Sequence, residues 1–180
     1  MAFKNALTDV SICSDALSYI AQGPIVSMND SGLAARECRR HYPRVVAILL
    51  EKYHWGIATK TANLVARPEA SDLKWLYQYD LPEDAAHVVR LAYSAGVSNQ
   101  SYHAGLRTII ESQEQRFSVE GRVLRTNVLD ATVDYVSYDI TEADFTESFA
   151  EAVRLKLASA IAMPITKRSD MRERYNNEAD

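Results

Sequence analysis

FSVEGRVLRTN (residues 117–127) opens the stretch that decides the fold, because it places Glu120-Gly121 at a turn between two short apolar runs. ATVDYVSYDI (131–140) follows, and its β-branched and aromatic residues favour a strand. TEADFTESFAEAVRLKLASAIAMPIT (141–166) then has the length and alanine content of a long helix. The stretch therefore predicts a β-hairpin and a further strand that lead directly into a helix.

The expected C-terminal helix carries signals at both ends. Thr141 is predicted to cap its start, with Asp144 placed to complete a capping box. Met163-Pro164 is predicted to end it, because proline cannot donate a backbone hydrogen bond. Its large apolar residues recur every fourth position, at Phe145, Phe149, Val153, Leu157 and Ile161. Such a row drifts around the helix, and the alanines between allow close approach, so we expect partners on more than one side.

Two further helices are expected in the N-terminal third. The first is predicted over about residues 8–22, where apolar residues repeat at helical spacing and Gly23-Pro24 supplies the end. The second is predicted from about residue 31 to residue 53. Pro43 falls inside it, so a kink or a fresh start is expected there.

The middle of the chain gives weaker signals. Residues 55–67 fit a strand and a loop, and Pro82-Glu83-Asp84 has the residue types of the first turn of a short helix. Residues 87–93 are predicted to form a strand and residues 94–105 a loop.

These elements predict a mainly α fold. We expect a helical bundle of four or five helices with a small antiparallel β element inserted at about residues 107–139. A single helical domain is expected over residues 1–167. Residues 168–180 are expected to form a charged tail that is mobile or docked on a partner.

Composition indicates a globular protein with a core. The 180 residues are 47% hydrophobic and 24% charged, which is not the composition of a disordered chain. The net charge of −4 argues against a freestanding nucleic-acid binder, since phosphate contact normally needs a basic face. No secretory signal and no membrane-spanning run is recognised, so the protein is expected in the cytosol when it is made.

Candidate ligand and catalytic residues do not form a recognisable site. Cys38 and His41 could share a helical face, but a zinc site usually needs two more nitrogen or sulfur ligands, so we expect no metal. Cys13 and Cys38 are expected to be buried thiols rather than a disulfide. Glu142 and Asp144 are expected to be solvated first-turn acids rather than a catalytic pair. No catalytic residue, cofactor or enzymatic activity is therefore expected.

A basic stripe on the second helix is the first candidate surface. It consists of Arg36, Arg39, Arg40 and Arg44. The stripe is either a solvated face with ordinary ion pairs or a surface that contacts another subunit or faces a channel.

The tail is the second candidate surface. Met171 and Tyr175 lie four residues apart on one expected helical face, with Arg168 and Arg172 beside them. This spacing makes these four residues candidates for binding a partner. The aromatic residues Trp75, Tyr77 and Tyr79 are expected to form a packed sheet face rather than a platform for nucleic-acid bases.

The order of three segments carries a resemblance to a known family. ICSDALSYIAQGPIVSMND (12–30) and AARECRRHYPRVVAILLEKYHW (34–55) have the order helix, Gly-Pro break, helix, and WLYQYDLPEDAAHVVRL (75–91) contains a Tyr-x-Leu-Pro-x-Asp pattern. Together with residues 117–166 they cover about residues 8–172. In this order they resemble bacteriophage head-to-tail connectors of the tail tubular protein A, or gatekeeper adaptor, family.

The resemblance implies a structural protein of the virion neck or tail that is present in the host cytoplasm during assembly. Copies would form a dodecameric ring under the portal protein, extend the DNA channel and hold the tail nozzle and tail tube proteins. DNA would pass through without specific binding, and no membrane and no cofactor would be involved.

Two functions of other classes stay open. A tail-associated peptidoglycan hydrolase would need a cleft with two facing carboxylates. A DNA-packaging completion protein would bind duplex DNA as a monomer in a salt-dependent way.

Overall fold

The computed structural model describes residues 7–68, 74–92, 116–166 and 176–177, and the chain divides into two compact units. The helical unit combines both ends of the chain, Met1–Ala58 and Tyr138–Asp180. The β unit is the middle of the chain, Thr59–Ser137.

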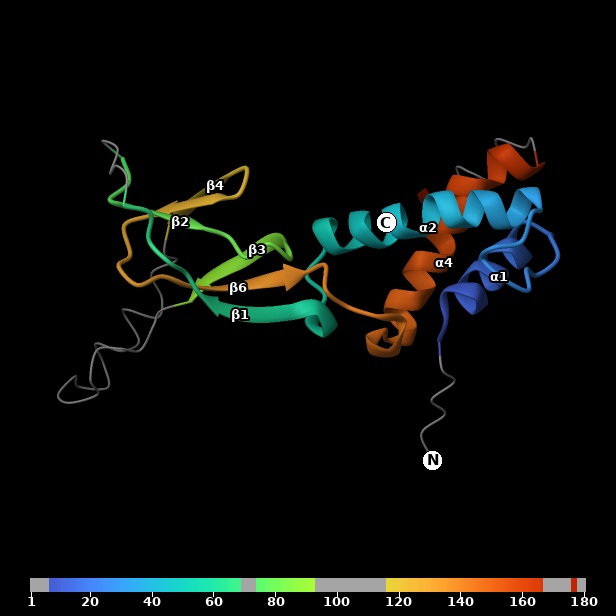
Figure 1. Cartoon of the computed structure of the whole chain (residues 1–180), viewed down its shortest axis with the longest axis horizontal. Coiled ribbons are helices and arrows are strands. Elements are labelled where there is room, and N and C mark those ends of the chain that lie inside the picture. The colour runs from blue at the N-terminus through green and yellow to red at the C-terminus, as the bar shows by residue number, and fades with distance from the viewer. Residues whose placement is uncertain (1–6, 69–73, 93–115, 167–175, 178–180) are drawn as a thin grey trace, which may run out of the picture. The chain divides into compact units, whose positions relative to one another are not determined.

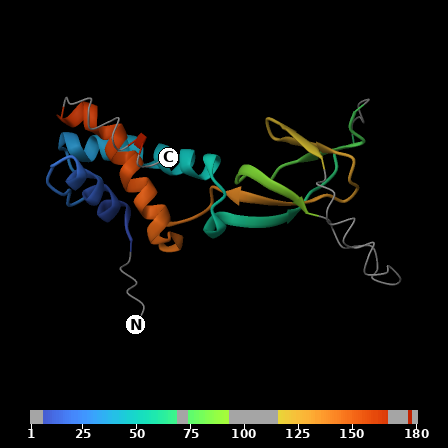
Figure 2. The same cartoon turned by 180° about the vertical axis from the view of Figure 1, so that it is seen from behind.

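Three helices form the described part of the helical unit: α1 (Asp9–Tyr19), α2 (Leu33–Lys52) and α4 (Glu147–Thr166). Helix α4 packs against both α1 and α2, as Figures 1 and 2 show from opposite sides. The hydroxyl of Thr8 caps the start of α1, where it accepts a hydrogen bond of 3.1 Å from the Ser11 amide. Ala21 follows α1 in the left-handed region, at φ 57°, and ends it there.

The core of the helical unit is built from one face of each helix. Ile12 and Leu17 of α1, Leu49 of α2, and Phe149 and Leu157 of α4 are all fully buried. Large side chains and alanines of α4 are both buried, as expected for a helix that packs against α1 and α2.

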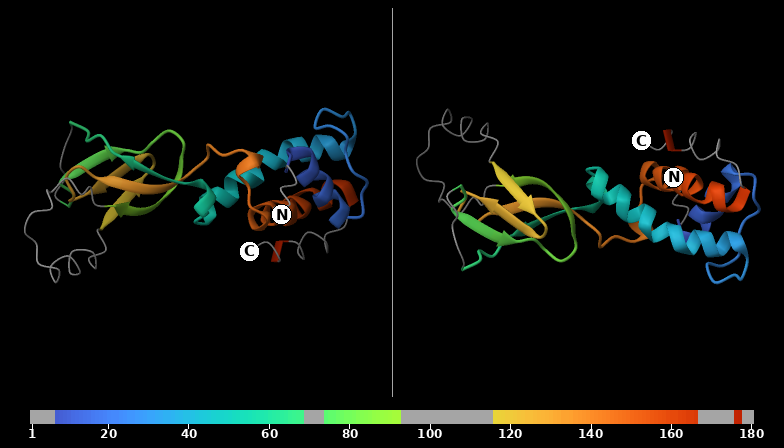
Figure 3. Two further views of the ribbon diagram at one scale, coloured as in Figure 1. Left: turned by 90° about the horizontal axis from the view of Figure 1, so that it is seen from below. Right: turned by 90° about the horizontal axis from the view of Figure 1, so that it is seen from above.

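The β unit contains two three-stranded antiparallel sheets in its described residues. The first has the strand order β1 (Thr59–Asn63), β6 (Thr132–Ser137), β3 (Ala85–Ala92). The second has the order β2 (Tyr77–Asp80), β5 (Val123–Thr126), β4 (Phe117–Glu120). Because β1 and β6 are antiparallel, with Thr59 opposite Val136, the chain enters and leaves the unit at one end of the first sheet (Figure 3).

Both sheets contribute to one core. Tyr79 and Leu124 of the second sheet are buried with Val133 and Tyr135 of the first. Leu64, which follows β1, joins the same cluster. The two sheets are therefore held together by apolar packing, as in other two-layer β structures.

The expected bundle of four or five helices with a small β element is wrong. The described residues contain three α-helices and six strands, and the strands begin at Thr59, far before residue 107. The strand expected within residues 55–67 is confirmed as β1, although both faces of its TKTAN sequence carry polar side chains. These residues pair with the apolar strand β6, and this tertiary pairing decides their conformation.

Pro164 and one short segment account for part of the surplus of expected helices. Helix α2 is one helix with Pro43 inside it, within the range expected for residues 31–53, whereas α4 continues through Pro164 to Thr166 instead of ending at Met163-Pro164. A helix tolerates the lost donor where the rest of one face is packed, as it is in both cases. Residues 82–84 form a turn instead of a helix, closed by the Ala85 amide, which donates to the Pro82 carbonyl at 3.0 Å.

Several local expectations are confirmed. The hairpin forms with Gly121 at φ 61°, and residues 85–92 form the strand expected near 87–93. The capping box of Thr141 and Asp144 is present, but it closes the short 3₁₀ helix Glu142–Asp144, and α4 begins at Glu147. The expected loop at 94–105 lies outside the described residues, and the boundary between residues 167 and 168 stays a prediction.

Candidate interaction surfaces

The four arginines of the basic stripe all lie exposed on α2. Arg36, Arg40 and Arg44 follow each other at four-residue spacing, and Arg39 lies beside them, so they share one helical face. The opposite face of α2 contains the buried residues that pack on the other helices. The stripe is therefore the face of α2 that points away from the core of its own unit.

Among the described residues, two arginines of the stripe, Arg36 and Arg39, donate side-chain hydrogen bonds to backbone carbonyls. The Arg39 guanidinium donates to the Met28 carbonyl at 3.2 Å, and that of Arg36 donates to the Ser31 carbonyl at 3.5 Å. These contacts fix the segment that leads into α2. Arg40 and Arg44 make no side-chain hydrogen bond or ion pair with the described residues.

A carboxylate cluster lies around Arg154 of α4. The Arg154 guanidinium lies 3.0 Å from Asp15 of α1, 3.2 Å from Glu151 and 3.5 Å from Glu147. Only 11% of the Arg154 side chain is exposed, whereas 72% of Glu147 and 53% of Asp15 are. Three carboxylates around one guanidinium leave an excess of negative charge that faces solvent.

The neighbouring carboxylates raise the pKa values of Arg154 and Tyr19. Burial lowers the pKa of Arg154, but the hydrogen bond with Glu151 and the charges of Asp15 and Glu147 outweigh it, so that the pKa is raised. Burial and a 2.8 Å hydrogen bond donated to Glu151 raise the pKa of Tyr19 to about 12. Arg154 is therefore charged and Tyr19 neutral at physiological pH.

This cluster was not predicted from the sequence. Glu147, Glu151 and Arg154 are spaced for one face of a helix, which the sequence alone could have indicated. Asp15 comes from α1, and only the tertiary packing of α1 on α4 brings it to Arg154.

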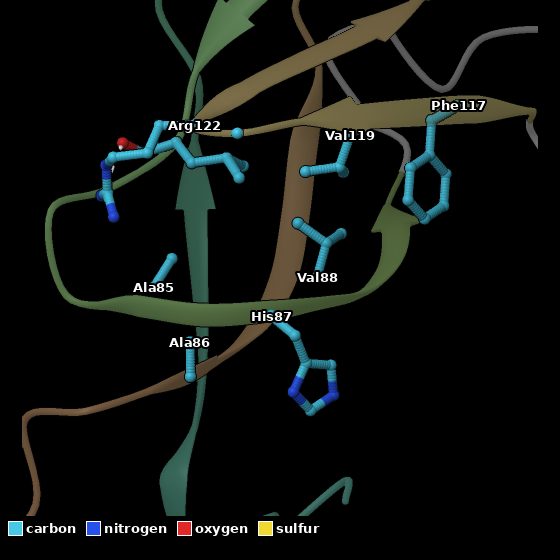
Figure 4. Close-up of a pocket in the computed structure, with 9 residues that line it drawn as sticks. Ala85, Ala86, His87, Val88, Phe117, Val119 and Arg122 are labelled. Atoms are coloured by element: carbon cyan, nitrogen blue, oxygen red, sulfur yellow. Dashed lines mark hydrogen bonds between the residues drawn. The ribbon is translucent and has the colours of Figure 1, made fainter. Parts of the chain in front are cut away.

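A pocket of about 340 Å³ lies in the β unit between β3 and the β4–β5 hairpin. Figure 4 shows Val88 and Val119 facing each other across it, with the Phe117 ring beside them. Arg122 lies at one end, where its guanidinium donates to the carbonyls of Leu81 and Pro82. The walls are mostly apolar and the guanidinium is already engaged, so the pocket offers little chemistry for recognising a polar ligand.

Asp84 is the centre of a polar network in the β unit. Its carboxylate accepts hydrogen bonds from the hydroxyls of Ser137 (2.6 Å) and Tyr135 (3.1 Å) and lies 3.1 Å from the Lys60 ammonium. The Ser137 hydrogen bond, with those of Lys60 and Tyr135, lowers the pKa of Asp84 despite partial burial. The network fixes the 82–84 turn to β6 and β1, and Ser137 is fully buried, so its role is structural.

The two acids considered as a catalytic pair also have structural partners. Glu142 accepts a 2.9 Å hydrogen bond from the Tyr42 hydroxyl, and Asp144 accepts two from Thr141.

Tyr79 and Trp75 are buried, as expected for a packed sheet face. Cys13 and Cys38 are free and buried, which confirms the expectation of thiols.

Three further expectations concern the tail residues, a metal site and a membrane-spanning helix. Arg168, Met171, Arg172 and Tyr175 lie outside the described residues, so their role in binding a partner stays a prediction. Across residues 7–68, 74–92, 116–166 and 176–177, no three acidic, His or Cys side chains are grouped to hold a metal ion. In the same ranges no helix is both long and apolar enough to cross a bilayer.

Comparison with known proteins gives no relative. No family model matches the chain, and a search of curated proteins finds no match.

Proposed function

We propose that this protein is a structural component of a bacteriophage virion, a head-to-tail adaptor that forms a ring between the portal and the tail and extends the DNA channel. The proposal starts from the resemblance of the segments within residues 8–172 to the tail tubular protein A family. The observation that carries it furthest is the outward face of α2, where Arg40 and Arg44 have no partner in the described part of their own chain. Unpaired charge on a rigid helix suits a contact with another protein subunit.

The polar groups considered for catalysis support a structural role. Glu142 and Asp144 hold the turn that precedes α4, and the mostly apolar pocket in the β unit has no carboxylate in its lining. A peptidoglycan hydrolase needs two facing carboxylates across a sugar cleft. The proposal therefore assigns no enzymatic activity and no cofactor.

The proposed partners are the portal protein, the tail nozzle and tail tube proteins, and further copies of this chain. Genomic DNA passes through the ring without specific binding, which suits the net charge of −4. Arg168, Met171, Arg172 and Tyr175 remain our candidates for the contact with a partner. The protein would be made in the host cytoplasm and end in the virion neck.

Co-sedimentation tests the proposal. Purified protein is mixed with DNA-filled heads that carry the portal but lack a tail, and the heads are pelleted. We expect the protein to pellet with these heads and not with portal-free procapsids. Failure to bind any portal-bearing particle would overturn the adaptor assignment.

Two further assays separate the alternatives. Clearing of cell-wall material in a zymogram would indicate the hydrolase. Salt-dependent retardation of duplex DNA by the monomer would indicate the packaging protein.

Deletion of residues 168–180 is the matched variant in the co-sedimentation assay: we expect it to stay folded and to lose attachment to the portal.

A further inference from the structure

The two charged surfaces of the helical unit carry opposite charge at the same spacing. Arg40 and Arg44 lie one helical turn apart on α2, and Glu147 and Glu151 lie one turn apart on α4. Four residues of an α-helix span about 6 Å along its axis, so both pairs have the same repeat. Asp15 adds a third carboxylate beside the α4 pair, as Arg36 adds a third guanidinium beside the α2 pair.

A single copy cannot bring these surfaces together. The arginines lie on the face of α2 opposite to its buried residues, and α2 packs on α4 through that buried face. The carboxylates are held in place around Arg154, whose guanidinium neutralises only one of the three. Both surfaces therefore keep charge that another molecule can neutralise.

We propose that the α2 arginine stripe of one copy docks on the Asp15–Glu147–Glu151 cluster of a second copy, with Arg40 and Arg44 as its central contacts. The inference rests on the proposed function, because it names the faces through which copies would meet in the ring. The contact joins two different surfaces, so it is heterologous, and a heterologous contact closes into a ring when its rotation allows. Guanidinium groups suit this role because each can bind a carboxylate through two parallel hydrogen bonds.

Charge exchange between the two surfaces tests the contact. Two variants of the full chain are made, R40E/R44E and D15K/E147K, and each is checked for a native circular dichroism spectrum. A control, K74E/R116E, makes the same change of net charge as R40E/R44E, but at exposed positions of the β unit. Self-association of each is measured by sedimentation velocity at low ionic strength and high protein concentration.

The expected pattern is specific. Wild type and the control associate reversibly, and salt weakens the association. Each double variant alone associates at least about tenfold more weakly, since several opposed charges are lost. An equimolar mixture of the two variants restores association, because the reversed charges are again complementary.

A second readout identifies the contact directly. The R40K/R44K variant keeps the charge and supplies amines that a zero-length carbodiimide can join to carboxylates. The reaction is run on a mixture of ¹⁵N-labelled and unlabelled protein, so that links between copies are recognised by mass. We expect mixed-label links from positions 40 and 44 to Asp15, Glu147 or Glu151.

The inference is wrong if wild type does not associate at low ionic strength, or if R40E/R44E associates as strongly as wild type. It is also wrong if the equimolar mixture of the two folded charge variants does not associate. Mixed-label links that join only residues outside the two proposed surfaces would overturn it as well. Tight binding of duplex DNA that depends on Arg40 and Arg44 at physiological salt would also overturn it, by assigning the stripe to nucleic acid. In each case wild-type co-sedimentation with portal-bearing heads would leave the proposed function standing, so the two failures are distinguishable.

Discussion

The ring of Phe149 on α4 meets the ring of Trp55, which follows α2, edge to face at a centroid distance of 4.8 Å. Phe145 contacts Phe149 in the same way at 4.6 Å, and the Trp55 indole donates to the Leu49 carbonyl at 2.9 Å. Edge-to-face pairs of this kind add to the stabilisation from burial. This aromatic group therefore fixes the start of α4 against the end of α2.

Phe149→Ala should destabilise the helical unit strongly. Removal of a fully buried phenylalanine leaves a cavity and costs about 3–5 kcal/mol. Glu147→Ala, two residues earlier, removes a mostly exposed carboxylate and should cost under about 0.5 kcal/mol. Urea unfolding followed by tryptophan fluorescence measures both variants. Similar midpoints for the two would show that the faces of α4 are assigned wrongly.

The β4–β5 hairpin should depend on Gly121. Its φ of 61° lies in the left-handed region, and a Cβ there meets no atom within 4 Å, so the cost of Gly121→Ala is purely conformational. We expect a loss of about 1–2 kcal/mol. Gly56→Ala is the matched control, because Gly56 also has open space but no positive φ. Equal amide exchange rates in the β4 and β5 strands of the two variants would contradict the prediction.

Asp84 should make stability depend on pH in the acid range. Its folded pKa is lowered below the ordinary value of 3.8, so its charge stabilises the fold fully above that value, and this stabilisation is lost as pH falls through the lowered pKa. Asp84→Asn should cost about 1–3 kcal/mol at pH 7, because the buried hydroxyl of Ser137 loses a charged acceptor.

The test compares urea unfolding of wild type and Asp84→Asn from pH 7 to pH 3. The difference between them should narrow below pH 4. Glu83→Gln, at the exposed neighbouring position, should unfold like wild type throughout. A constant difference across the whole range would show that the charge of Asp84 is not what stabilises the turn.

The sequence predicted local structure where the signal is local. Glu120-Gly121 predicted the hairpin, because a tight turn needs a residue that tolerates positive φ. Thr141 and Asp144 predicted the capping box, because three-residue spacing alone allows it. Pro164 gave a wrong end for the last helix, since the packing of α4 outweighs the loss of one backbone donor.

A charged surface could be predicted from the sequence only where all of its residues lie on one helix. The four arginines of α2 were recognisable from spacing, and the structure places all four on the exposed face. The carboxylate cluster was not, because Asp15 lies far from Arg154 in sequence and meets it only through packing of α1 on α4. The same is true of the Asp84 network, whose members come from β1, β6 and the 82–84 turn.

The two thiols should be unreactive in the folded protein. Cys13 and Cys38 are both fully buried, so a thiol reagent cannot reach either sulfur in the folded protein. The hydrogen bond with Cys38 and burial raise the pKa of Cys13, whereas the hydrogen bond with Cys13 lowers the pKa of Cys38. Because the reaction needs an accessible thiolate, neither thiol should react at pH 8 without denaturant. In urea both of the chain's two cysteines should react. Rapid labelling of the native protein would indicate that α1 separates from α2 in solution.

The free protein should be largely monomeric in dilute buffer at physiological salt, and should form rings only on its portal. The charged contact proposed above consists of exposed ion pairs, each worth about 0.2–1 kcal/mol. Association of two molecules costs about 4–15 kcal/mol of lost freedom, and salt at 0.15 M screens charges beyond roughly 8 Å. A few such pairs therefore cannot hold a ring together alone, whereas a portal that binds several copies side by side raises their local concentration.

Light scattering over a concentration series should give the mass of one chain, 20.2 kDa, until portal is added. Stable rings in dilute buffer without portal would contradict this prediction and would require an apolar contact between copies besides the charged one.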